Sequence, residues 1–166
     1  MRQQKWILPA LAAVCIAAVA VMIVALVVSG NHTKQADFSP PPFDTAAQVG
    51  VPAVPDGLDF GEIDAKAYQF SVCGTVQLAD GQADVYFTNP EENTVWLKLR
   101  VLDESGNMLG ETGLIRPGEY VQSVAIDASP ADGAAIRLKI MAYEPDTYHS
   151  AGSGILKTSI KSACKG

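Results

Sequence analysis

The sequence predicts an all-β protein: one two-sheet antiparallel β-sandwich of about seven strands, preceded by a transmembrane helix and a proline-rich linker. Beyond residue 67, short segments of alternating apolar and polar residues recur about every 8–12 residues, separated by turn residues. No amphipathic helical pattern interrupts them. A single long, uncharged, mostly apolar run lies near the N-terminus. We expect a cytoplasmic stub and transmembrane helix in residues 1–30, an extracellular linker in 31–57 and the β-sandwich domain in 58–166.

The N-terminal run, Trp6–Val28, is long enough to cross a membrane. At about 1.5 Å per residue its helix would be about 34 Å long. Arg2 and Lys5 precede it, so the positive-inside rule keeps the N-terminus cytoplasmic and exports the chain after Gly30. We predict a retained signal anchor; a cleaved signal is the alternative, with Val28-Ser29-Gly30 as a poor cleavage site.

The exported part is acidic and begins with a proline-rich segment. Asn31–Gly57 contains Pro40-Pro41-Pro42, Pro52 and Pro55, a density that favours an extended tether. Residues 31–166 carry 10 Lys and Arg against 18 Asp and Glu, a formal charge of −8. This charge repels nucleic acid, so we exclude DNA and RNA as partners.

The first predicted strands follow a transition at Leu58–Ala67, which is either a short helical turn or an edge strand. Tyr68–Leu78 is expected to be one strand because apolar and polar side chains alternate along it. Asp80-Gly81 predicts a hairpin turn and Ala83–Thr88 the returning strand. The loop Asn89–Asn93 contains a proline, which ends the ladder.

Two strands of the second half have the clearest alternation. Thr94–Asp103 points Val95, Leu97, Leu99 and Val101 to one side, and Ala135–Tyr143 does the same with Ile136, Leu138, Ile140 and Ala142. We expect these side chains to form the core between two sheets. The remaining strands are predicted at Met108–Thr112, Tyr120–Ile126 and Gly154–Ile160.

Three stretches of the predicted domain, Asn89–Asn93, Leu102–Asn107 and Glu111–Tyr120, accompany the short basic N-terminus, the apolar segment and the tether. With these features the chain resembles the small single-pass, membrane-anchored exported proteins of Firmicutes that carry one Ig-like β-sandwich. The resemblance covers about residues 1–160 and implies an Ig-like fold and a cell-membrane location with the C-terminal domain outside. It brings no established activity and no catalytic residue.

No residue pattern predicts catalysis or a cofactor. His149 lies in a polar loop beside Tyr148 and Ser150, but no orienting acid or nucleophile elbow accompanies it. Metal-ligand spacing and a phosphate-binding glycine loop are both missing, so we expect no metal and no cofactor. Cys73 and Cys164 are the two cysteines outside the apolar run; they form either one disulfide or two independent small residues.

One surface pattern predicts binding. The outward positions of the two clearest strands are mostly basic, and in an Ig-like topology these strands are neighbours in one sheet. We therefore expect a non-enzymatic binding or assembly module whose partner is a protein or an anionic wall polymer. A carbohydrate-binding module is one alternative and a secreted enzyme another. The candidate binding face consists of Trp96, Lys98, Arg100, Arg137 and Lys139.

Overall fold

The structure is a computed structural model, and it describes residue 16 and residues 18–24, 38–127 and 130–162. The chain divides into two compact units, Met1–Ser39 and Pro40–Gly166. In the first unit the described residues 16 and 18–24 are helical. Most of the predicted span Trp6–Val28 lies outside the described residues. Within the described part of the chain, no helix combines the length and the apolar character needed to cross a membrane.

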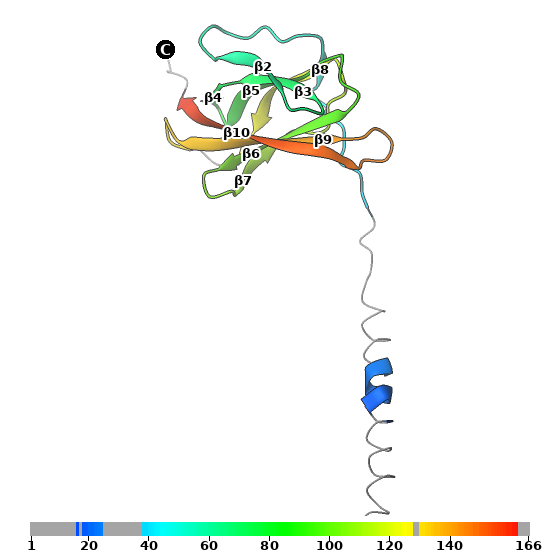
Figure 1. The fold of residues 1–166 in the computed structure, drawn as a ribbon. Helices are drawn as coiled ribbons and strands as arrows, with labels where there is room; N and C mark the ends of the chain where they lie inside the picture. Colours follow the sequence, from blue (N-terminus) through cyan, green and yellow to red (C-terminus); the bar gives the residue numbers. More distant parts are fainter. Residues whose placement is uncertain (1–15, 17, 25–37, 128–129, 163–166) are drawn as a thin grey trace, which may run out of the picture. The chain divides into compact units, whose positions relative to one another are not determined.

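The second unit is all-β, as the sequence predicts (Figure 1). Its described residues form ten strands. They are β1 (Gln48–Val49), β2 (Phe60–Asp64), β3 (Gln69–Cys73), β4 (Thr75–Ala79), β5 (Gln82–Asn89), β6 (Trp96–Asp103), β7 (Met108–Glu111), β8 (Glu119–Ala125), β9 (Ala135–Tyr143) and β10 (Ser150–Ser162).

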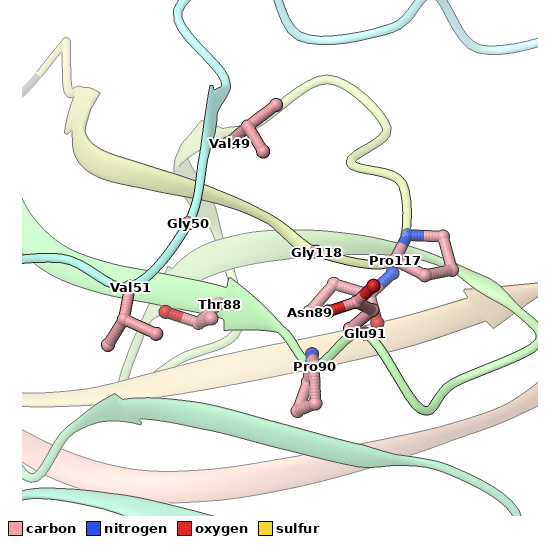
Figure 2. Close-up of a pocket in the computed structure, with 9 residues that line it drawn as sticks. All are labelled: Val49, Gly50, Val51, Thr88, Asn89, Pro90, Glu91, Pro117 and Gly118. Carbon is pink, nitrogen blue, oxygen red and sulfur yellow. The ribbon is translucent and has the colours of Figure 1, made fainter.

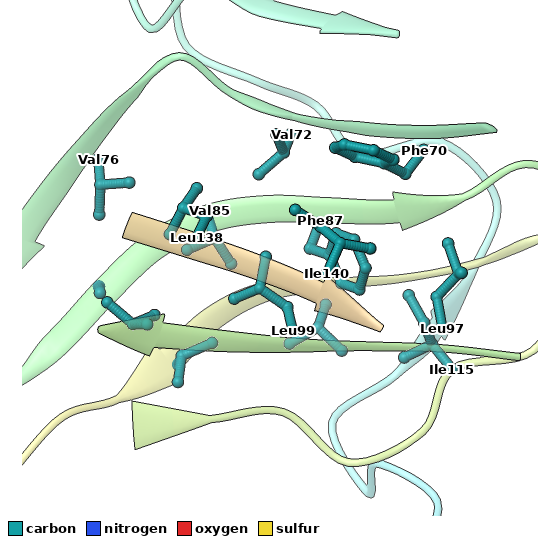
Figure 3. Close-up of a cluster of buried hydrophobic side chains, with 14 of the residues drawn as sticks. Phe70, Val72, Val76, Val85, Phe87, Leu97, Leu99, Ile115, Leu138 and Ile140 are labelled. Atoms are coloured by element: carbon teal, nitrogen blue, oxygen red, sulfur yellow. The ribbon is translucent and has the colours of Figure 1, made fainter. Parts of the chain in front are cut away.

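The strands form one curled sheet in the order β1-β8-β5-β4-β10-β9-β6-β7, with β3 pairing to β5 and β2 to β3. Every pair is antiparallel except β4 with β10, which run parallel and join the two halves of the sheet. The curl brings the half that contains β3, β5 and β8 to face the half that contains β10, β9, β6 and β7 (Figures 1 and 3).

The core lies between these two halves. Figure 3 shows Phe70, Val85 and Phe87 from one half pointing towards Leu99 and Leu138 from the other. All eight side chains predicted to point inward, those of Val95 just before β6 and of seven residues in β6 and β9, are buried, so the predicted inward positions are confirmed. Of the positions predicted to point outward, Met141 is buried too. Apolar burial of this kind stabilises a fold by about 1.5–3 kcal/mol per large side chain.

The predicted single strand Tyr68–Leu78 is wrong in one respect, because it is two strands that part at Gly74. Before the glycine, β3 pairs with β2 and β5; after it, β4 pairs with β5 and β10. A Cβ on Gly74 would lie 3.0 Å from the Cβ of Asp59, so a larger residue would crowd the chain that leads into β2. The chain thus changes its pairing partners at Gly74, where the absence of a side chain leaves room for Asp59.

The predicted boundary between linker and domain also needs correction, because Pro40–Gly57 belongs to the folded unit. The backbone of Phe43 bridges to Leu114 in parallel, and β1 pairs with β8. Pro52 is buried. We call Pro40–Gly57 the N-terminal strap. Its prolines suit this role, since they occupy positions where the extended backbone runs over the sheet without needing every N–H.

Candidate functional site

The predicted binding face lies on the outside of the half-sheet β10-β9-β6-β7. The neighbouring placement of the two clearest strands is confirmed, since β6 pairs antiparallel with β9. Arg100 is opposite Lys139, and Leu102 is opposite Arg137. Directly opposed residues of an antiparallel pair point to the same face, so the basic side chains of both strands share one surface.

The expectation that Lys98 projects into solvent is wrong. Lys98 is 6% exposed, and its Nζ lies 2.7 Å from Oε1 of Glu111. The second carboxylate oxygen of Glu111 lies 2.6 Å from Nε of Arg100. The edge strand β7 causes this arrangement, because its register places Glu111 opposite Arg100. One carboxylate therefore compensates two of the five residues predicted for the face.

The ionisation of Glu111 reflects these contacts. Burial by itself would raise the pKa of its carboxyl, but the hydrogen bonds from Lys98 and Arg100 and their positive charges outweigh burial. The net result is a pKa below the ordinary value of a glutamate. Glu111 is consequently a carboxylate at neutral pH, and it makes the two strands β6 and β7 adhere through charge-assisted hydrogen bonds.

The ring of Trp96 packs against other aromatic side chains. Its ring meets Phe43 of the N-terminal strap edge-on at 4.8 Å and Tyr148 of the β9–β10 loop at 5.2 Å. The Arg116 guanidinium lies 3.6 Å from the centre of the Phe43 ring on the strap. Sugar-binding sites need an aromatic face open to the ligand, and these neighbours occupy the surroundings of Trp96. Tyr86 is buried as well, so it offers no exposed ring to a sugar.

Three basic residues of this face have no carboxylate partner among the described residues. They are Arg137, Lys139 and Lys157. Lys157 was not predicted, although alternation along Gly154–Ile160 would have placed it outward. It is the cross-strand partner of Arg137 in β10, while Ile155 is the partner of Lys139. Ile155 is 56% exposed, so an apolar side chain lies next to the uncompensated charges.

The charge of this face opposes that of its unit. Residues 40–166 contain 9 Lys and Arg and 17 Asp and Glu. Five of those basic residues and one acidic residue, Glu111, point outward from β6, β7, β9 and the part of β10 that pairs with β9. Lys161, in the part of β10 that pairs with β4, is a further exposed basic residue and is left out of this set. We call this surface the basic face. The five basic residues are Lys98, Arg100, Arg137, Lys139 and Lys157.

The described surface has several hollows, and two of them bear on function. One, of about 250 Å³, lies where β5 ends against the strap, and Figure 2 shows Val49 and Val51 at its rim. Its lining is largely apolar and includes one ionisable side chain, Glu91. Asn89 at its base is fully buried and donates hydrogen bonds to the carbonyl oxygens of Val95 and Ile115. That amide is committed to holding the fold, which leaves the hollow without a polar group arranged for chemistry.

The other hollow, of about 300 Å³, opens at one end of the basic face. It is lined by Glu104, Ala135, Ile136, Arg137, Lys157 and Thr158. Two adjacent strands supply its basic side chains, and the β6–β7 turn supplies Glu104. Here uncompensated positive charge of the basic face coincides with a hollow.

His149 follows Tyr148, whose ring contacts Trp96. His149 is exposed in the β9–β10 loop, where its backbone N–H donates to Oγ1 of Thr147. Across residues 16, 18–24, 38–127 and 130–162, no group of three His, Cys, Asp or Glu side chains is placed to hold a metal ion. No nucleophile–base pair involving His149 was found in that same part of the chain.

Cys73 is buried in β3 and forms no disulfide within the described residues, while Cys164 lies outside them, so the possible disulfide stays a prediction. Leu58 and Tyr86 pack with Cys73 in a small apolar cluster. Burial, reinforced by two nearby aspartates, raises the pKa of the Cys73 thiol to about 11. A thiol held protonated in this way is a poor nucleophile.

Comparisons with known proteins give weak likenesses. No family model and no curated protein matches the chain. A solved structure of CopC from Methylosinus trichosporium OB3b is 15% identical, with a TM-score of 0.36, over 62% of this chain and 94% of CopC. A β-glucuronidase from Ruminococcus gnavus, in complex with uronic isofagomine, is 21% identical with a TM-score of 0.37 over 55% of this chain. The matched part is 15% of that enzyme, and at these TM-scores neither likeness supports an inference about this chain.

Proposed function

We propose that this protein is a membrane-anchored, extracytoplasmic binding module of Ig-like fold, and that its basic face docks an acidic surface of a protein partner at the cell surface. The observation that carries the proposal is the charge separation. An acidic unit gathers five of its nine basic residues on one sheet face. Complementary charge of this kind steers association and fixes the orientation of a partner.

The strand order supports the Ig-like part of the proposal. Ig-like sandwiches place strands G-F-C in one sheet, extended by C′ in variable-type domains, and B and E side by side in the other. The order β10-β9-β6-β7 corresponds to G-F-C-C′, and β5 beside β8 corresponds to B beside E. The strap supplies a further short strand, β1, at the outer edge of β8.

The N-terminal sequence supports the anchor. Trp6–Val28 contains no charged residue and Arg2 and Lys5 precede it. The described helical residues of this run expose large apolar side chains, which is the pattern of a helix that faces lipid. These side chains are Ile16, Val19, Val21, Met22, Ile23 and Val24.

Exposed apolar residues beside the basic ones favour a protein partner over an anionic polymer. Ile155 is 56% exposed and Met108, on the edge strand β7, is 58% exposed. Protein interfaces combine an apolar centre with a polar rim, and methionine and arginine are enriched there. A polyanionic wall polymer offers charge without a matching apolar surface. A carbohydrate-binding role is less well supported, since Trp96 is packed against Phe43 and Tyr148.

The proposal can be tested by photocrosslinking in native membranes. A photoreactive amino acid at Ile155 should capture one acidic protein in cells that carry the wild-type chain, and high salt should reduce the yield. The variant Lys139→Glu should lose this adduct, because it reverses an uncompensated charge in the centre of the face. Lys66→Glu reverses an exposed lysine in the turn after β2 and serves as the matched control.

The outcomes separate the alternatives. Loss of the adduct in Lys139→Glu but not in Lys66→Glu supports the proposal, provided that both variants keep the wild-type melting temperature. An adduct of equal yield in both variants overturns it. Capture of a phosphate-rich polymer in place of a protein would assign the face to the cell wall and would overturn the protein partner.

A further inference from the structure

Two like charges oppose each other at the end of the basic face. Lys157 of β10 and Arg137 of β9 are direct cross-strand partners, and the diagonal neighbour Lys139 adds a third positive charge. Like charges in directly opposite positions destabilise a sheet. Among the described residues, no ion pair compensates any of the three. Arg100, which faces Lys139 from the other side, is by contrast paired with Glu111.

Arg137 is held in place without being neutralised. Its Nε and Nη2 lie 3.3 Å from the carbonyl oxygen of Asp103, and Nη2 donates to the carbonyl oxygen of Glu104 at 2.7 Å. The turn that carries these carbonyls is itself fixed, since Asp103 accepts hydrogen bonds from the backbone N–H and the side chain of Asn107. These contacts orient the guanidinium and leave its full positive charge, and Nη1 makes no hydrogen bond within the described residues.

The hollow beside this pair gives the charge a recess. Arg137, Lys157 and Thr158 line it, together with the apolar side chains of Ala135 and Ile136. Glu104 also lines the hollow, but no ion pair joins it to Arg137 or Lys157. The volume of about 300 Å³ exceeds what one acidic side chain needs and falls at the lower end of the range of small-ligand sites.

We propose that the hollow between Arg137 and Lys157 is an oxyanion subsite that takes the carboxylate of an acidic side chain of the partner, with Ile155 contacting an apolar side chain next to it. This inference rests on the proposed function and specifies its recognition chemistry. A carboxylate between Arg137 and Lys157 turns their repulsion into two charge-assisted contacts. A planar guanidinium already held along one edge meets the carboxylate with little further loss of conformational freedom.

Lys157→Gln tests the subsite directly, because Lys157 is exposed and its side chain makes no hydrogen bond or ion pair within the described part of the chain. The probe is a fluorescently labelled hexaglutamate peptide, titrated with the full-length protein in neutral detergent and followed by anisotropy. We expect Lys157→Gln to weaken binding about fivefold, which corresponds to an exposed charge contact of about 1 kcal/mol. Lys66→Gln should bind as the wild type does, and Lys157→Arg should restore most of the affinity.

A second readout distinguishes the subsite from a structural role. Without peptide, Lys157→Gln should melt at the wild-type temperature or slightly above it, because the substitution relieves repulsion with Arg137. Equal peptide affinity in Lys157→Gln and Lys66→Gln overturns the subsite, while the crosslinking result for Lys139→Glu still judges the wider face. A poly(glycerol phosphate) probe that binds more tightly than hexaglutamate and shows the same dependence on Lys157 overturns the carboxylate as the occupant.

Discussion

Removing Glu111 should destabilise the folded unit far more than an exposed glutamate substitution would. The Lys98 side chain is 7% exposed and that of Glu111 is 31% exposed. Breaking a buried ion pair from one side costs about 3–5 kcal/mol, because the remaining charge is left without a counter-ion. Since Glu111 keeps nearly a third of its surface in solvent, we discount this figure to about 2–3 kcal/mol for Glu111→Ala.

The matched substitution on the other side of the pair should behave differently. Lys98→Met keeps the length of the side chain and removes the buried charge, and Glu111 still holds Arg100 at 2.6 Å. Replacement of a buried charge by an apolar side chain of similar volume is neutral or stabilising, so we expect a change between zero and about 1 kcal/mol in favour of folding. The double variant Lys98→Met with Glu111→Ala should lose much less stability than Glu111→Ala alone.

Urea denaturation at pH 7, followed by tryptophan fluorescence, measures these free energies. The slope of the transition must stay constant across the variants for the comparison to hold. A loss below about 0.5 kcal/mol in Glu111→Ala would refute the reasoning, since this is the range of an exposed pair. A loss in Lys98→Met equal to that in Glu111→Ala would refute it too, because it would mean that packing, not charge, sets the energy.

The same pair predicts a pH dependence. Because the pKa of Glu111 in the folded protein lies below its ordinary value of 4.5, the carboxylate contributes stability that is fully present above that value. The contribution is lost as the pH falls through the lower, folded pKa. The wild type should therefore lose more stability than Glu111→Ala when the pH falls below about 4.5, and the difference between the two should shrink with acid.

Three further predictions concern the fold. Tyr68→Phe should stabilise the protein by about 1 kcal/mol in urea denaturation, since the Tyr68 hydroxyl is buried with no hydrogen-bond partner among the described residues; a loss of stability would show that it has one. Gly113→Ala should cost about 2 kcal/mol and speed thermolysin cleavage in the strap, because the new Cβ would clash with the backbone nitrogen of Asp44; unchanged cleavage would contradict this. Iodoacetamide should label Cys73 only in urea and without reductant, as mass spectrometry of its peptide can show; labelling that requires reductant would indicate a disulfide with Cys164.

Local alternation was enough to predict the strands that build the core. Leu97, Leu99, Leu138 and Ile140 are buried where their period of two placed them, and the outward positions of β6 and β9 share one face. The same rule could have placed Lys157 outward on β10. Such predictions succeed because successive side chains of a strand point to opposite faces, so a strand with one buried face alternates apolar and polar residues.

The features that the sequence did not predict depend on contacts between residues that lie far apart in the chain. Nothing local to Lys98 indicates that Glu111, thirteen residues later, will cover its charge through a bulged edge strand. The prediction that the strap is part of a free linker failed for a similar reason. Its prolines favour an extended chain, but an extended chain can either be free or lie along a sheet. In the structure the backbone N–H of Gly113 donates a hydrogen bond to the carboxylate of Asp44, which helps to hold the strap on the sheet. These two residues are 69 positions apart, so the local sequence does not reveal this contact.

Not all five basic residues of the basic face are therefore available to a partner. Lys98 and Arg100 are occupied by Glu111, so their role is to fasten β7 to β6. Arg137 and Lys157 oppose each other without compensation, and this arrangement costs stability unless an anion joins them. The ion pair of Lys98 with Glu111 and the uncompensated pair of Arg137 with Lys157 should thus respond differently to mutation. Neutralising Glu111 should lower the free energy of unfolding. Neutralising Lys157 should leave that free energy unchanged and lower the affinity for the partner.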